Sequence, residues 1–224
     1  VFLSFIRNAA SKSRHLLILG DLFYYYFENR RRRVPRFEWL ITALEQASEN
    51  WASIVLIRGN RDYLLGTTAL FPKSLCAADD CLIDMLDKTV LVTHGDQFLH
   101  GERGYYVFRR FMRSSPSRLF TRNIYPAIGV KMADGLRWIS FRNNRGKGYA
   151  RPDFQKIVKM AKSKCADCVV FGHFHVNLSP EDFEGNTPSC WCVGSWESTA
   201  SPVLKLTRGV FQYFEATSDG LKGE

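Results

Sequence analysis

Four short apolar runs, each followed by a polar block that contains glycine, constrain the fold of this chain more than any other feature. The runs cover residues 16–19, 54–57, 90–92 and 168–171. Continuous apolar runs of this length predict strands that are covered on both faces of a sheet. Because open α/β sheets bind their ligands at the carboxyl ends of strands, the polar blocks mark the expected functional site.

The segments between and after these runs predict an α/β protein. Residues 37–47 and 153–164 repeat apolar positions at helical spacing, so each predicts a helix that precedes a strand. Three later segments predict closing strands, the last two joined by a turn at Arg208 and Gly209: 191–193, 203–206 and 210–214. With 224 residues, 46% of them hydrophobic, the chain is expected to form one domain, 1–224.

The polar blocks carry side chains that bind metal ions. They are Gly20-Asp21, Gly59-Asn60-Arg61-Asp62, His94-Gly95-Asp96 and Gly172-His173-Phe174-His175. Each block alone is typical of a turn, but their joint occurrence at strand ends favours a metal site. Carboxylate, amide and imidazole donors suit Mn²⁺, Zn²⁺ or Fe better than metals that prefer thiolates. Two such ions can clamp the attacking and leaving oxygens of a displacement at phosphorus.

With these blocks in this order, the chain resembles the calcineurin-like metallophosphoesterases. Within them it is most similar to the bacterial UDP-2,3-diacylglucosamine pyrophosphohydrolases of lipid A synthesis, through residues 17–23 and 59–66 and the two histidine blocks. The resemblance covers nearly the whole chain. It implies a four-layer α/β/β/α sandwich of two mixed β-sheets, with a helical insertion, or lid, at about 98–145.

The resemblance also implies a site for two divalent metal ions, with Mn²⁺ preferred and Zn²⁺ or Fe as alternatives. Asp21 would bridge the two ions. Asn60, His94 and His173 would complete one metal site, and His175 would belong to the other.

Four further residues receive roles from the resemblance. Arg61 would bind substrate phosphate, for which a guanidinium fork is suited. Asp62 and Asp96 would act in catalysis by orienting ligands or loops. Glu102 would bind substrate.

The chain departs from the family at its start. Members open with a strand ending in Asp-x-His, which supplies two ligands to the metal site that His175 shares, and no such pair precedes Gly20. Residues 1–7 resemble the helix that follows that strand, so the first strand is expected to be missing. A truncated chain, an omitted N-terminal segment and a degraded copy are all open at this stage.

Charge and cysteine content narrow the cellular context. The net charge of +9 and the pI near 9.4 favour a polyanionic partner. The arginine run at 30–33 fits a solvated loop or a role beside the membrane or at substrate phosphate. No run of about 18 apolar residues exists, which excludes a membrane span. The six cysteines, with Cys168 and Cys190 in apolar runs, are expected to pack as free thiols in a reducing cytosol.

The insertion at 98–145 bears on the substrate. It interleaves bulky apolar and cationic residues in 105–113, 119–125 and 136–142, so helices there would have an apolar and a basic face. Such helices can bind an anionic bilayer surface and cover the metals with a groove for acyl chains. An ordinary helical excursion packed on the core is the alternative.

The main functional hypothesis is hydrolysis of UDP-2,3-diacylglucosamine to UMP and 2,3-diacylglucosamine 1-phosphate by a cytoplasmic enzyme peripheral on the inner membrane. The partners would be the nucleotide-lipid and an anionic membrane surface, with no stable nucleic-acid partner and an oligomeric state that the sequence does not indicate. One alternative is a metallophosphoesterase acting on nucleotides or nucleic acid. The other is a catalytically impaired lipid- or polyanion-binding protein that lacks one metal site.

Overall fold

The computed structural model describes residues 2–10, 13–23, 25–26, 35–85, 87–100, 103–124, 128–129, 131, 135, 151–185, 187–196, 201–217 and 220–222. The helices are α1 (Phe2–Ala9), α2 (Pro35–Ser48), α3 (Arg103–Met112), α4 (Ser115–Asn123) and α6 (Phe154–Lys164), with short 3₁₀ turns η1 (Asp96–Phe98) and η2 (Pro180–Phe183). The strands are β1 (His15–Ile18), β2 (Ser53–Ile57), β3 (Leu75–Ala78), β4 (Asp80–Met85), β5 (Lys88–Thr93), β6 (Cys168–Phe171), β7 (Ser189–Cys192), β8 (Pro202–Thr207), β9 (Val210–Thr217) and β10 (Gly220–Lys222).

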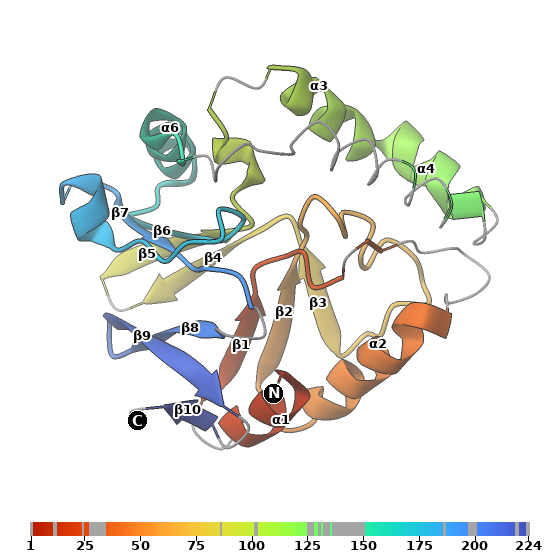
Figure 1. The fold of residues 1–224 in the computed structure, drawn as a ribbon, viewed down its shortest axis with the longest axis horizontal. Helices are drawn as coiled ribbons and strands as arrows, with labels where there is room; N and C mark the ends of the chain where they lie inside the picture. The colour runs from red at the N-terminus through yellow and green to blue at the C-terminus, as the bar shows by residue number, and fades with distance from the viewer. Residues whose placement is uncertain are drawn as a thin grey trace.

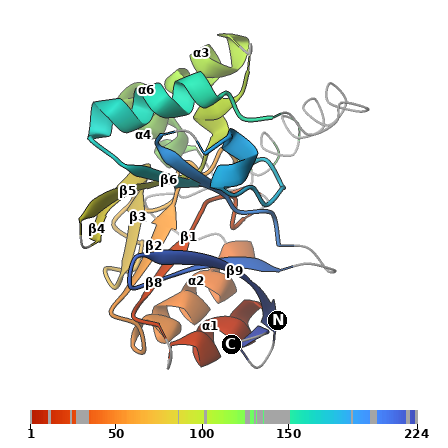
Figure 2. The same ribbon diagram turned by 90° about the vertical axis from the view of Figure 1, so that its left-hand side faces the viewer.

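The strands lie between two layers of helices. Helices α3, α4 and α6 cover one side and α1 and α2 the other, which confirms the expected α/β class (Figures 1 and 2). The first sheet, β1-β2-β3, is parallel, and the second, β4-β5-β6-β7, is mixed because only β4 runs antiparallel. Two sheets were expected, but β8, β9 and β10 hydrogen-bond only among themselves in the described residues and form a third.

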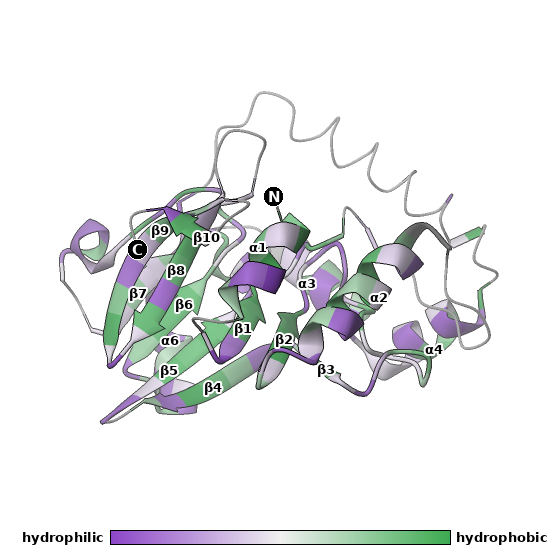
Figure 3. Ribbon diagram, turned by 90° about the horizontal axis from the view of Figure 1, so that it is seen from below, coloured by the Kyte–Doolittle hydropathy of each residue, from purple (hydrophilic) through white to green (hydrophobic). Residues whose placement is uncertain are grey.

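The four apolar runs form β1, β2, β5 and β6, as the sequence predicts. These strands are largely apolar (Figure 3), and every residue of β6 is buried. Leu91 and Val169 pack with Ile157 of α6, whereas Ile54 packs with Leu44 of α2. Fully burying a side chain of this size contributes about 1.5–3 kcal/mol, so packing against helices on both sides holds the strand ends in place.

Strands β3, β4 and β10 lie outside the sequence prediction. Strand β3 is short, and β4 has polar residues at Asp80 and Asp84 and exposes Leu82, so it lacks a continuous apolar run. Helix α1 includes most of residues 1–7, the segment that resembles the first helix of the family, and its Ile6 is fully buried. The predicted helices at 37–47 and 153–164 match α2 and α6, and the side chain of Asp153 caps α6.

In the described part of the 98–145 insertion, the chain forms helices α3 and α4. Residues 136–142 and the arginine run at 30–33 fall outside the described residues. In the described part of the chain, no helix is both long enough and apolar enough to cross a bilayer.

All six cysteines are free thiols. Cys168, Cys190 and Cys192 are buried, as expected of thiols that pack as small apolar groups, and burial raises the pKa of each to about 12. Cys76 and Cys165 are exposed.

Candidate metal centre

The four polar blocks meet where β1, β2, β5 and β6 end. Asp21 follows β1 and Asn60 follows β2, which are parallel neighbours in the first sheet. His94 follows β5 and His173 follows β6, which are parallel neighbours in the second sheet. The Gly172 N–H donates to the carbonyl of His94 at 2.9 Å, so the two histidine blocks stay in register beyond the strands. The site therefore takes side chains from both sheets.

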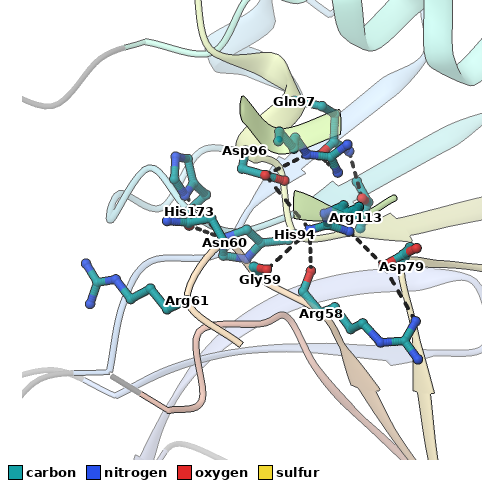
Figure 4. Close-up of polar contacts among 12 residues, drawn as sticks. Arg58, Gly59, Asn60, Arg61, Asp79, His94, Asp96, Gln97, Arg113 and His173 are labelled. Atoms are coloured by element: carbon teal, nitrogen blue, oxygen red, sulfur yellow. Dashed lines mark hydrogen bonds and ion pairs between the residues drawn. The ribbon is translucent and has the colours of Figure 1, made fainter. Parts of the chain in front are cut away.

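The side-chain atoms of these residues converge. One ligand atom each from Asp21, His94 and His173 lies within 4.8 Å of the others. The His94 Nε2 atom is 3.1 Å from Asn60 Oδ1, 3.1 Å from His173 Nδ1 and 3.6 Å from Asp21 Oδ1. Asn60, His94 and His173 are seen together in Figure 4. The geometry thus assembles the four residues that the sequence assigned to one metal site.

Local contacts favour both histidines as metal ligands. His94 Nδ1 lies 2.6 Å from the carbonyl oxygen of Leu19, which can only accept, so this nitrogen carries the proton and Nε2 presents its lone pair to the site. Burial, and to a smaller extent the neighbouring His94, lower the pKa of His173 to about 4. A neutral imidazole is the form that binds a metal ion.

The backbone approaches itself closely at the site, and glycine makes this possible. A Cβ on Gly20, whose φ is +90°, would lie 2.5 Å from His94 Nδ1, and one on Gly59 would overlap the Asp21 carboxylate. Asp21 and His173 themselves have φ values of 51° and 72°. Such left-handed backbone costs about 1–3 kcal/mol in a non-glycine residue and is concentrated at functional sites.

Asp62 is fully buried and ties the Asp21 loop to the Asn60 loop. Its Oδ1 accepts the N–H of Gly59 at 2.6 Å and of Asp21 at 3.3 Å, and its Oδ2 accepts the N–H of Leu22 at 2.9 Å. Burial and the Asp21 carboxylate raise the pKa of Asp62 above its usual value. These contacts join the two loops, and a role of Asp62 in catalysis stays a prediction.

Asp96 joins the His94 block to α3. Its Oδ2 accepts from the Tyr105 hydroxyl and from Arg109 Nε, both at 2.7 Å, and no hydrogen-bond partner for Oδ1 lies among the described residues. Burial would raise the pKa of Asp96, but Arg109, His94 and Arg113 together outweigh it and hold this pKa at about 2. The inward direction of Arg109 differs from the expectation that the α3 arginines face lipid head groups, because a buried carboxylate binds the guanidinium.

Of the other residues that the resemblance assigned to the site, Arg61 and His175 do not join the converging group. Arg61 Nε is 3.4 Å from Asp21 Oδ2, and its side chain is 42% exposed beside the converging atoms. His175 is exposed, has a φ of 57° and is outside the converging group in the described structure. Glu102 falls outside the described residues.

Sequence reasoning missed the contribution of α3 and of the β3–β4 link. Arg113 and Asp79 pair at 2.7 Å behind Asn60, and Tyr105 and Arg109 hold Asp96. The spacing of Tyr105, Arg109 and Arg113 at i, i+4 and i+8 was the available signal, because it places them on one face of a helix.

The donor set fits a divalent cation. Asp21 Oδ1, Asn60 Oδ1 and His94 Nε2 are electron-pair donors that face one another, and a positive ion satisfies such a group. Two imidazoles with carboxylate and amide oxygens suit Mn²⁺, Zn²⁺ or Fe.

Comparisons with known proteins identify relatives. No family model matches the chain. It is 31% identical to the UDP-2,3-diacylglucosamine hydrolase of Photorhabdus laumondii over 92% of this chain and 87% of that protein. For the protein of the same name from Stutzerimonas stutzeri, the identity is 33% over 88% of this chain and 83% of the relative. Vps29 from Cryptosporidium parvum is a solved structure with 12% identity and a TM-score of 0.40, covering 91% of this chain and 96% of that one.

An α/β fold with a candidate metal-binding group at its strand ends, together with relatives named as hydrolases, indicates a metal-dependent phosphoesterase. The relatives exceed 30% identity over most of both chains and are named as hydrolases. This chain belongs to the UDP-2,3-diacylglucosamine hydrolase family.

Proposed function

We propose that this protein hydrolyses UDP-2,3-diacylglucosamine to UMP and 2,3-diacylglucosamine 1-phosphate, with two divalent metal ions, preferably Mn²⁺. The observation that carries the proposal is the convergence of Asp21, Asn60, His94 and His173 beside the exposed guanidinium of Arg61. The relatives named for this substrate support the choice of nucleotide-lipid.

Each ligand has a role in the proposal. Asn60, His94 and His173 would hold one ion together with Asp21, and Asp21 and His175 would contribute to a second. Ions held by these residues would supply Lewis-acid chemistry toward the phosphoryl oxygens. The His94 proton donated to Leu19 keeps Nε2 aimed at the site, so the ligand geometry exists before substrate binds.

The residues around the ligands bind phosphate and fix the loops. Arg61 binds the diphosphate, because its side chain is 42% exposed and its fork matches phosphate oxygens. Asp62 and Asp96 keep the ligand loops in place through the hydrogen bonds described above. Glu102 is proposed as a further substrate-binding residue by resemblance alone.

The insertion is proposed to act as a lid and to bind acyl chains at the cytoplasmic face of the inner membrane. Helices α3 and α4 form the outer part of the described structure in Figure 1. They expose large apolar side chains: Val107 at 71%, Phe108 at 47%, Phe111 at 62%, Leu119 at 51% and Phe120 at 65%. Several large apolar side chains exposed on two neighbouring helices favour contact with lipid or protein, and the net charge of +9 favours an anionic bilayer.

The experiment measures UMP release from UDP-2,3-diacylglucosamine in mixed micelles with Mn²⁺. We expect turnover by the full chain, its loss in His173→Ala, and no change in His15→Ala, because His15 is exposed at the start of β1, the end of the strand away from the site. Hydrolysis of a soluble diester in preference to the nucleotide-lipid would instead favour a nucleotide phosphodiesterase. Binding to anionic vesicles with one metal ion and no hydrolysis would favour a non-catalytic binding protein.

A further inference from the structure

Arg113 follows the last residue of α3 and reaches the backbone just before Asn60. Its Nη2 donates to the carbonyl of Arg58 at 3.1 Å and to that of Gly59 at 3.2 Å, and its Nη1 donates to Asp79 Oδ1 at 2.7 Å (Figure 4). The side chain is 10% exposed. The planar fork of arginine can span a carboxylate and two carbonyls at once, which lysine cannot.

The Gly59 peptide units are held from two sides. The N–H of Gly59 donates to Asp62 Oδ1 at 2.6 Å, and its carbonyl, which belongs to the peptide bond with Asn60, accepts from Arg113. A movement of the Arg113 side chain would therefore displace the peptide bond that joins Gly59 to Asn60. Asn60 Oδ1 is in turn 3.1 Å from His94 Nε2, within the converging group.

Asp79, in the link between β3 and β4, fixes the position of this arginine. Its carboxylate also pairs with Arg58 Nη1 at 3.5 Å and with Arg118 Nη2 at 3.3 Å. Arg58 follows β2 and Arg118 lies in α4, so one carboxylate binds both insertion helices to the end of the strand that carries Asn60. Arg113 Nη2 also lies 3.9 Å from Oδ2 of a second carboxylate, that of Asp96.

We propose that Arg113 and Asp79 are a positioning pair that couples the α3–α4 insertion to the metal ligand Asn60. The inference rests on the metal site of the proposed function, but not on the identity of the substrate. Arg113 does not touch the converging atoms itself. It sets metal affinity by fixing the peptide from which Asn60 projects, and the outer partners of metal ligands typically change affinity by roughly 10- to 100-fold.

The test measures the Mn²⁺ dissociation constant by electron paramagnetic resonance of free Mn²⁺. We expect Arg113→Ala to weaken binding roughly 10-fold or more. Asp79→Asn should weaken it in the same direction, and Arg113→Lys should recover only part of the affinity. Arg110→Ala, on the exposed face of the same helix, is the matched control and should bind Mn²⁺ as the unchanged chain does. At saturating Mn²⁺, kcat of Arg113→Ala should recover, which a general loss of structure would not allow.

A second readout uses the metal-free protein. Amide hydrogen exchange in residues 58–62 should be faster in Arg113→Ala than in the unchanged chain, with equal exchange elsewhere. If Arg113→Ala does not fold, Asp79→Asn is measured in its place. A folded variant with unchanged Mn²⁺ affinity and unchanged exchange would overturn the inference. If the unchanged chain binds no Mn²⁺, the proposed function fails, and the exchange measurement alone decides whether the pair holds this loop.

Discussion

The Asp62 carboxylate accepts the backbone N–H of Asp21, although 41 residues separate the two in the chain. The same carboxylate accepts the N–H groups of Leu22 and Gly59, so one buried side chain joins the loops after β1 and β2. We expect Asp62→Ala to lower the free energy of unfolding by about 3 kcal/mol, because buried N–H groups lose their partner. Denaturant unfolding measures it, and Asp87→Ala, at an exposed turn, should change stability by less than about 0.5 kcal/mol.

The Asp21 carboxylate lies so close to Gly59 that adding one methyl group at Gly59 should impair function. Gly59→Ala should lower hydrolysis and Mn²⁺ affinity by at least about tenfold, because its Cβ would overlap the Asp21 carboxylate. Gly104→Ala is the matched control, since its Cβ would meet no atom within 4 Å. This control lies in α3 and should gain up to about 1 kcal/mol of stability from helix propensity. Equal activity in the two variants would contradict the described loop geometry.

Binding of a divalent ion should stabilise the fold. An ion at 100 times its dissociation constant contributes about 2.7 kcal/mol if the unfolded chain does not bind it. We expect Mn²⁺ to raise the melting temperature and a chelator to remove the increase. In His173→Ala most of the increase should vanish, whereas His15→Ala should keep it. An Mn²⁺-dependent increase of full size in His173→Ala would exclude this histidine as a ligand.

The arginines around Asp79 predict a pH dependence of stability. Burial would raise the pKa of Asp79, but Arg113, Arg58 and Arg118 outweigh it and hold the pKa below its usual value. The ionised carboxylate therefore stabilises the fold above the pKa of the unfolded chain, about 4, and this contribution is lost as the pH falls through the lower folded value. Asp79→Asn should be less stable than the unchanged chain at pH 7, and the difference should narrow below about pH 4. A difference that grows on acidification would contradict this.

The exposed apolar side chains of α3 should contribute to membrane binding but not to the stability of the fold. Replacing both Val107 and Phe111 by serine should weaken binding to phosphatidylglycerol vesicles by at least about tenfold, because each side chain buried in the bilayer contributes about 1.5–3 kcal/mol. Vesicle sedimentation measures this. Val210→Ser, at a 65% exposed position of β9, is the control and should bind as the unchanged chain does. Equal loss in both would point to a nonspecific effect.

The helices and strands that could be predicted are those whose sequence pattern lies within a few adjacent residues. The apolar runs predicted β1, β2, β5 and β6, and helical spacing predicted α2 and α6. Strand β4 was missed because the pattern from Asp80 to Asp84 mixes polar and apolar residues in a strand exposed at the sheet edge. In the site, Asp21, Asn60, His94 and His173 could be assigned because each lies within three residues of a strand end, in a block that resembles a family motif.

The support behind those ligands was not predictable, because it depends on contacts between distant segments. The pair of Arg113 and Asp79 spans 34 residues, and neither belongs to a polar block at a strand end. The direction of an arginine on an amphipathic helix follows from what packs against that helix. The sequence pattern alone favoured lipid for the α3 arginines, whereas the tertiary structure turns Arg109 and Arg113 toward carboxylates.

The converging residues come in equal numbers from two sheets that are not hydrogen-bonded to each other in the described residues: Asp21 and Asn60 from one, His94 and His173 from the other. An ion bound by all four is consequently a cross-link between two halves of the molecule. Separation of the two sheets would move these side chains apart and would therefore disrupt such a site.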